Sequence, residues 1–126
     1  MPIEKNNSYV KEMTTNFHVL NWNVQGLSNK INEIEYLIST HCLDVISITE
    51  HWLDVYTLST FLLSDFTLAN TYCRNVYNRG GVAIFVRNGL DYKSLDFVNK
   101  LSIETICEAS AVLIEEFNII VLSIYR

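Results

Sequence analysis

Residues 17–50 read FHVLNWNVQGLSNKINEIEYLISTHCLDVISITE and decide the fold class of this chain. The stretch opens with a short apolar run that predicts a strand, followed by turn-forming residues at 23–26. Apolar residues then recur at helical spacing from Leu27, so we expect a helix that ends near His41. Residues 43–49 are nearly all apolar or β-branched, as in a strand covered on both faces. Strand, helix and strand in this order predict a βαβ unit with two parallel, neighbouring strands.

The rest of the chain has the pattern of antiparallel strands. They are expected at 66–72, 82–87, weakly at 92–97, at 106–115 and at 118–125. Asn78-Arg79-Gly80-Gly81 reads as a tight turn into one of these strands, and Asn88-Gly89 as the turn that follows it. Glu116-Phe117 joins the last two strands in a hairpin. The chain therefore begins as α/β and continues as an antiparallel meander.

The composition is that of a packed domain. Of the 126 residues, 49% are hydrophobic and 18% are charged, with a single proline and four glycines, which excludes a disordered tail and a multi-domain protein. Residues 1–16 lack periodicity and read as a mobile lead-in, and residues 17–126 as the folded part. A net charge of −5 gives no long-range attraction for polyanions, so it counts against a nucleic-acid binder without excluding one.

Location and redox state follow from what the sequence lacks. No apolar run approaches the roughly 18–20 residues that cross a bilayer, and no signal peptide is recognisable. We therefore expect an intracellular protein that is not secreted, with the nucleus as one compartment open to it. Its three cysteines are odd in number and form no C-x-x-C pair, which argues against disulfides and zinc and predicts reduced, buried thiols.

Three polar residues stand where strands end: Asn23, Glu50 and Tyr125. The carboxyl ends of adjacent parallel strands are the usual place for ligands, so Asn23 and Glu50 are expected side by side. A carboxylate beside a carboxamide suits a hard cation such as Mg²⁺, with water and substrate phosphate as further ligands. The plainer alternative is that Glu50 is a solvated loop residue and Asn23 a turn former.

Other candidates carry less chemistry. The three histidines have no metal-ligand spacing, and no Ser or Cys lies in a nucleophile elbow. Asp44 reads as a carboxylate that connects a helix to a strand. Gly80-Gly81 lacks the spacing of a phosphate-binding loop and reads as a turn.

Four segments in order resemble a known family. They are Asn21-Trp22-Asn23-Val24-Gln25-Gly26-Leu27, Ile48-Thr49-Glu50-His51-Trp52-Leu53, Arg79-Gly80-Gly81-Val82-Ala83-Ile84-Phe85-Val86 and Val121-Leu122-Ser123-Ile124-Tyr125-Arg126. These look like successive blocks of the endonuclease/exonuclease/phosphatase superfamily. They are most similar to the endonuclease domains of non-LTR retrotransposons, and the resemblance covers residues 17–126.

The resemblance implies a fold and a chemistry. The fold is an α/β (α+β) four-layer sandwich, two β-sheets flanked by helices, and the chemistry is Mg²⁺-dependent hydrolysis of DNA phosphodiesters, with Mn²⁺ as a substitute. By motif, Asn23 matches an asparagine at the metal and phosphate, Glu50 the metal-binding glutamate, and Tyr125 a tyrosine that contacts the scissile phosphate. Gln25 departs from the family pattern, because many relatives carry Asp or Asn at this position. The resemblance therefore does not support a metal or water contact there. No membrane partner is implied, and a reverse transcriptase domain can follow in the parent protein.

The family pattern also continues past the last block. An Asp-x-Asn motif and a terminal Asp-His pair follow it, whereas this sequence stops at Arg126. We therefore expect the N-terminal part of such a domain, with the second half missing, an apolar sheet face left uncovered and negligible nuclease activity. Two alternatives remain open. One is a phosphatase or phosphodiesterase of the same fold that acts on small phosphorylated molecules, and the other is a non-catalytic remnant.

Overall fold

The computed structural model describes residues 16–126, and the lead-in expected over residues 1–16 lies outside them apart from Asn16. Strand β1 (Val19–Asn23), helix α2 (Ile31–Thr40) and strand β2 (Val45–Thr49) form the βαβ unit. The two strands pair in parallel, with a register that runs from Val19 opposite Val45 to Asn23 opposite Thr49. All five residues of β2 are buried, which confirms a strand covered on both faces.

The first helical segment departs from the sequence prediction. The chain makes a 3-10 turn η1 (Leu27–Asn29) before α2 begins, so the helix expected from Leu27 is divided in two. The backbone N–H of Leu27 donates to the carbonyl oxygen of His51 at 3.0 Å. That long-range hydrogen bond holds the start of the segment against the loop after β2, which local helical spacing cannot reveal.

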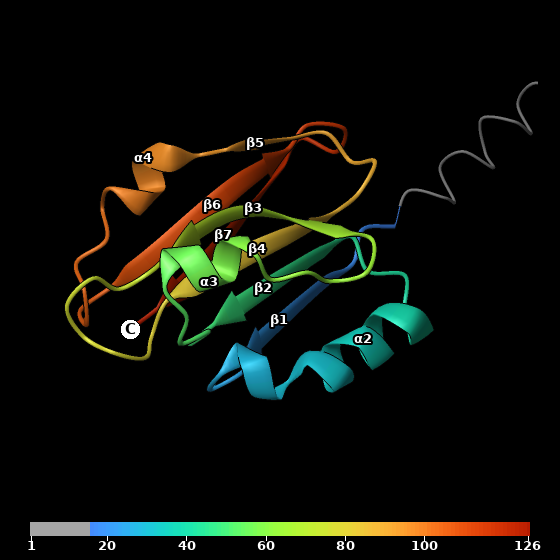
Figure 1. The fold of residues 1–126 in the computed structure, drawn as a ribbon. Helices are drawn as coiled ribbons and strands as arrows, with labels where there is room; N and C mark the ends of the chain where they lie inside the picture. The colour runs from blue at the N-terminus through green and yellow to red at the C-terminus, as the bar shows by residue number, and fades with distance from the viewer. Residues whose placement is uncertain (1–15) are drawn as a thin grey trace, which may run out of the picture.

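The strands of the described residues form two sheets (Figure 1). Helix α3 is Val55–Ser59 and helix α4 is Asp96–Asn99; the strands are β3 (Phe66–Tyr72), β4 (Val82–Arg87), β5 (Tyr92–Ser94), β6 (Glu108–Ile114) and β7 (Ile119–Tyr125). The first sheet has the order β1-β2-β4-β3, and the second β5-β6-β7. The expected meander is thus shared between two sheets. The weak strand expected at 92–97 ends at Ser94, because α4 begins at Asp96.

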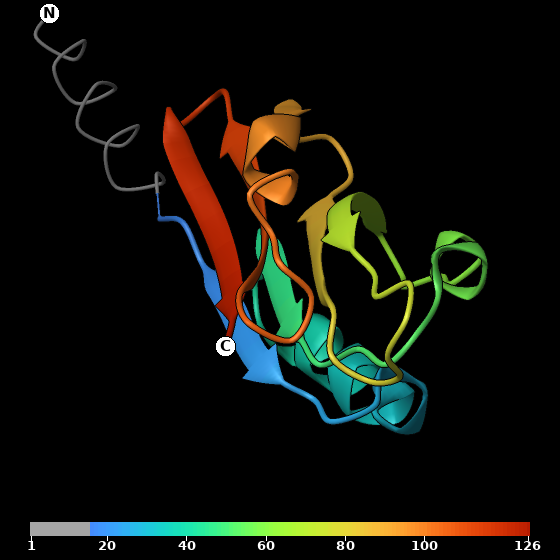
Figure 2. The same cartoon turned by 90° about the vertical axis from the view of Figure 1, so that its left-hand side faces the viewer.

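The core has two layers, one on each face of the first sheet. Alternate residues of β2 and β4, including Ile46 and Phe85, pack with Leu27 and Ile34 on the helical side. Their neighbours Val45 and Ile84 pack with Val112 of the second sheet. Figure 2 shows the two sheets facing each other. The two-sheet α/β fold expected from the sequence is therefore confirmed.

The outer surface carries several large apolar side chains. On β7, Ile120, Leu122 and Ile124 are exposed, whereas the alternate residues Val121 and Ser123 are buried. The cysteine prediction is wrong at one position, because Cys42 follows α2 on the surface and is exposed; Cys73 is buried and Cys107 half-buried. Within residues 16–126, no helix is both long enough and apolar enough to cross a membrane.

Candidate active site

Asn23 and Glu50 lie side by side at the carboxyl ends of the two parallel strands. The Asn23 Nδ2 group donates a 2.8 Å hydrogen bond to Glu50 Oε2. Asn23 is the last residue of β1 and Glu50 follows the last residue of β2, so the parallel register brings them to one edge. The expected pairing of these two side chains is present in the structure.

The Glu50 carboxyl is held by more than one donor. Trp52 Nε1 donates to Glu50 Oε1 at 3.3 Å, and the Tyr125 hydroxyl at the end of β7 also interacts with this carboxyl. Partial burial by itself raises the pKa of Glu50, but the hydrogen bond from Asn23, the nearby Tyr125 hydroxyl, the hydrogen bond from Trp52 and the charge of Arg74 outweigh it. The net result is a pKa below the ordinary value for glutamate. The structure thus brings Asn23, Glu50 and Tyr125 together around one ionised carboxylate.

The backbone around Glu50 is strained and well anchored. Glu50 has a φ of 58° and Trp52 a φ of 65°, a left-handed conformation that residues with a side chain seldom adopt. The Glu50 N–H donates to the Gly81 carbonyl at 2.7 Å, and the Gly26 N–H donates to the Glu50 carbonyl at 2.9 Å. Loops from both sides therefore fix the turn that carries Glu50.

Gln25 does not join this cluster. It lies in the loop after β1 with a φ of 48° and is exposed. No hydrogen bond links its side chain to another of the described residues, 16–126. The structure therefore shows no hydrogen bond between the Gln25 side chain and Glu50.

His51, next to Glu50 in sequence, has a structural position. Its ring is buried, with Nδ1 accepting from the Leu53 N–H at 2.9 Å and Nε2 lying 3.1 Å from the Tyr72 carbonyl oxygen. The first contact leaves Nδ1 without a proton, so Nε2 is the nitrogen that donates. Burial lowers the pKa of His51 below its ordinary value. This histidine is neutral at pH 7 and both of its nitrogens are engaged within the protein.

Asp44 also has a structural role, as the sequence predicted. Its Oδ1 accepts from Arg87 Nη2 at 2.8 Å, and its Oδ2 accepts from the His18 N–H at 2.9 Å. These contacts connect β4 and the start of β1 to the beginning of β2. The carboxylate therefore fastens strands at the end of the sheet opposite Glu50.

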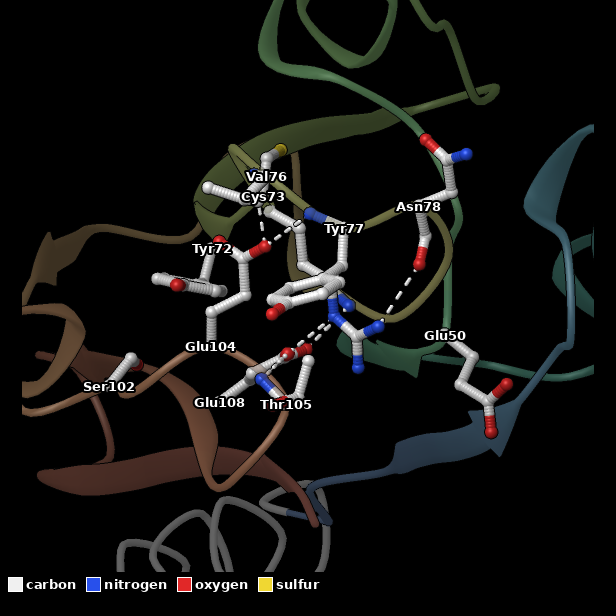
Figure 3. A network of polar contacts seen from close by, with 12 residues as sticks. Glu50, Tyr72, Cys73, Val76, Tyr77, Asn78, Ser102, Glu104, Thr105 and Glu108 are labelled. Atoms are coloured by element: carbon white, nitrogen blue, oxygen red, sulfur yellow. Dashed lines mark hydrogen bonds and ion pairs between the residues drawn. The ribbon is translucent and has the colours of Figure 1, made fainter.

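One group near the site was missed by the sequence prediction. Glu108 at the start of β6 is fully buried, and it pairs with Arg74, a residue of the loop between β3 and β4. Its other oxygen, Oε1, accepts from the Gly81 N–H at 2.8 Å. Figure 3 shows this network beside Glu50. A carboxylate at the edge of an apolar strand was the available signal, since such a group is seldom buried without a partner.

The residues present suit one kind of metal site. Within residues 16–126, no three His, Cys, Asp or Glu side chains cluster in a way that could hold a metal ion. Asn23 and Glu50 offer one amide oxygen and one carboxylate. This donor set does not fit tetrahedral zinc, but it fits Mg²⁺, which is commonly held by one or two carboxylates with waters and substrate phosphate.

Comparison with protein families agrees with the fold. The model of the endonuclease/exonuclease/phosphatase family matches residues 20–121, so the chain belongs to that family. Its members hydrolyse phosphate esters and generally use divalent metal ions. No curated protein and no solved structure matches the chain.

Proposed function

We propose that the Asn23–Glu50–Tyr125 site binds Mg²⁺ and a phosphodiester of DNA, in the manner of a retroelement-type endonuclease. One observation carries the proposal: a single carboxylate with a lowered pKa, hydrogen-bonded to an amide from the neighbouring parallel strand. The four sequence blocks that resemble retrotransposon endonucleases support DNA as the substrate.

Each residue has a distinct part in this proposal. Glu50 holds the cation, and its lowered pKa keeps it charged well below neutral pH. Asn23 fixes the orientation of Glu50 through its 2.8 Å hydrogen bond and offers its amide oxygen to the same ion. The Tyr125 hydroxyl donates to a phosphate oxygen. When bound, the cation neutralises charge on the phosphate and on the leaving oxygen.

We also propose that this chain alone turns over substrate very slowly. Hydrolysis needs a group that activates water, and such general-base assistance contributes about 10²–10⁴-fold to the rate. Within residues 16–126, Glu50 is committed to the cation, and His51 is buried with both ring nitrogens engaged. Measuring the binding of metal and phosphodiester, rather than turnover, is therefore the most direct test of the site.

Paramagnetic Mn²⁺ provides that test. Added to ¹⁵N-labelled chain, it should broaden the amide resonances of Asn23, Glu50 and Tyr125 before all others. Glu50→Gln keeps the side-chain shape and removes the charge, so the broadening should disappear. Glu33→Gln on the exposed face of α2 is the matched control and should behave as wild type. Equal broadening in Glu50→Gln and wild type would refute a cation site at Glu50.

The substrate class is tested in the same samples. A short DNA should tighten Mn²⁺ binding, because a phosphate bound at the ion and the ion itself favour each other. A small phosphate monoester should do so less. Tighter coupling to the monoester than to DNA would favour the phosphatase alternative. Supercoiled plasmid should be nicked at a negligible rate by this chain with Mg²⁺ or Mn²⁺, and fast nicking that requires Glu50 would contradict the slow turnover.

A further inference from the structure

A cavity of about 280 Å³ lies beside the Glu50 site and is not used by the proposed chemistry. Its lining includes two arginines and two aromatic residues, Arg74, Arg79, Trp52 and Tyr77. They come from the loop between β3 and β4 and from the loop after β2. Loops that carry cationic and aromatic groups next to a hydrolytic site are candidates for substrate recognition.

Trp52 connects this cavity to Glu50. Its indole Nε1 donates to Glu50 Oε1 at 3.3 Å, and the guanidinium carbon of Arg79 lies 4.5 Å from the centre of its ring system. One edge of the indole therefore contacts the proposed metal ligand, while its face supports a cation in the cavity. A group bound against Arg79 and Trp52 would be one side chain away from a phosphate at Glu50.

The charges of the cavity favour an anion. Arg79 is exposed and forms no ion pair with the carboxylates of residues 16–126; its guanidinium group lies over the Trp52 ring. The single carboxylate in the lining, Asp54, accepts from the Thr57 N–H at 2.7 Å as the cap of α3. Arg74 is already paired with the buried Glu108, so Arg79 is the cation of the lining that is left to meet an anion.

The loop that carries Arg79 is held in place before any ligand binds. Glu104 accepts hydrogen bonds from three successive backbone N–H groups, those of Asn75, Val76 and Tyr77, at 2.9, 3.0 and 2.6 Å (Figure 3). Behind it, Arg74 is fixed by Glu108 and donates to the Asn78 carbonyl at 3.0 Å. Because the loop is already ordered, ligand binding does not have to supply the cost of ordering it.

We propose that this cavity receives a nucleotide with an unpaired base, adjacent to the phosphate that binds at Glu50. The base stacks on the Arg79–Trp52 pair, and the phosphate of the same nucleotide pairs with the Arg79 guanidinium group. This rests on the proposed function and deepens it, because it makes single-stranded or locally opened DNA the preferred substrate. A base held in a duplex by its partner and its stacking neighbours could not enter so small a cavity.

The test uses the indole N–H resonance of Trp52 in the 126-residue chain, assigned with Trp22→Phe, since these are the only two tryptophans. EDTA keeps metal ions out of the experiment. Deoxyadenosine monophosphate should shift the Trp52 resonance saturably. Deoxyribose 5-phosphate should bind about 5- to 100-fold more weakly, because it lacks the stacking base. Equal affinities for the two probes, or no shift at Trp52, would overturn the proposal.

Two variants and two DNA forms sharpen the result. Arg79→Gln should weaken nucleotide binding, whereas Lys100→Gln, an equal charge change at an exposed site after α4, should not. A single-stranded oligonucleotide should compete with the nucleotide, and the same sequence as a blunt duplex should compete poorly. Equal competition by the duplex would refute the unpaired base. Since the nucleotide assay contains no metal, the two proposals can fail separately. Nucleotide binding without Mn²⁺ binding would refute only the proposed function. Mn²⁺ binding without nucleotide binding would refute only this inference.

Discussion

Arg74 and Glu108 form an ion pair that is almost fully buried, with 13% and 1% of the two side chains exposed. The Glu108 carboxylate also accepts the N–H groups of Gly81 and Thr105, at 2.8 and 2.9 Å. One carboxylate thus joins the loop between β3 and β4 to the second sheet. This connection holds together the loops that surround Glu50.

The first prediction concerns this ion pair. Glu108→Gln should lower the free energy of unfolding by about 3 kcal/mol, because a buried arginine is left without its counter-charge. Urea denaturation measures the change. Glu115→Gln is the control, since Glu115 pairs with Lys93 at the exposed surface, and it should change the free energy of unfolding by less than about 1 kcal/mol. Similar losses of unfolding free energy in both variants would show that the buried Arg74–Glu108 pair stabilises the fold no more than the exposed Lys93–Glu115 pair does.

A second prediction concerns the Glu50 carboxyl. Asn23→Ala removes a hydrogen bond that favours the ionised form, so the pKa of Glu50 should rise. An NMR titration that follows the side-chain carboxyl carbon of Glu50 gives this value directly. Asn21→Ala, at an exposed position two residues earlier on β1, should leave it unchanged. A pKa of Glu50 that stays the same in Asn23→Ala would mean that Asn23 does not tune the carboxylate.

The buried imidazole leads to a third prediction, on stability against pH. Burial lowers the pKa of His51 from 6.5, so the unfolded chain binds a proton more readily than the folded chain does. The stabilisation that comes from the neutral, buried His51 ring is fully present above pH 6.5. It is lost as the pH falls through the folded-state pKa of His51. Urea midpoints measured between about pH 5 and pH 8 should therefore decrease toward the acid side.

The matched variants for this third prediction are two histidine substitutions. His51→Gln should flatten the pH dependence, even though it lowers stability at neutral pH. His41→Gln, at an exposed position after α2, should keep the wild-type slope. An unchanged slope in His51→Gln would assign the pH dependence to other groups.

A fourth prediction compares two glycines that share a left-handed backbone. A Cβ at Gly81 would lie 2.4 Å from His51 Nε2, whereas one at Gly89 would meet nothing within 4 Å. Gly89→Ala should therefore cost only about 1 kcal/mol of folding free energy, from backbone strain. Gly81→Ala adds a steric clash to that strain and should cost several times more. Thermal or urea unfolding compares the two, and equal losses would contradict close packing of His51 on Gly81.

The sequence predicted the fold best where the signals are local. The strands at 66–72 and 82–87 have the expected bounds, because turn residues flank each run of strand-forming side chains. The parallel pairing of β1 and β2 follows from the βαβ pattern, and that pairing alone brings Asn23 next to Glu50. The main pair of the candidate site was therefore predictable without any long-range information.

What the sequence could not reveal depends on contacts between distant segments. The 3-10 turn at Leu27 exists because the loop after β2 accepts its N–H, and the Arg74–Glu108 pair joins residues 34 positions apart. The contacts of Trp52 with Glu50 and with Arg79 likewise depend on how the backbone folds at all three positions. Local sequence propensity does not predict contacts of this kind.

The left-handed backbone at Gln25, Glu50 and Trp52 has a consequence for evolution in the laboratory. Glycine or asparagine adopts this backbone conformation with less strain than these residues do. The two loops are therefore not optimised for thermal resistance. A library selected only for survival of heating should enrich such replacements at 50 and 52 and lose the carboxylate and the indole. Selection for ligand binding should retain both. The difference between the two enriched libraries would map the binding loops without an assay for catalysis.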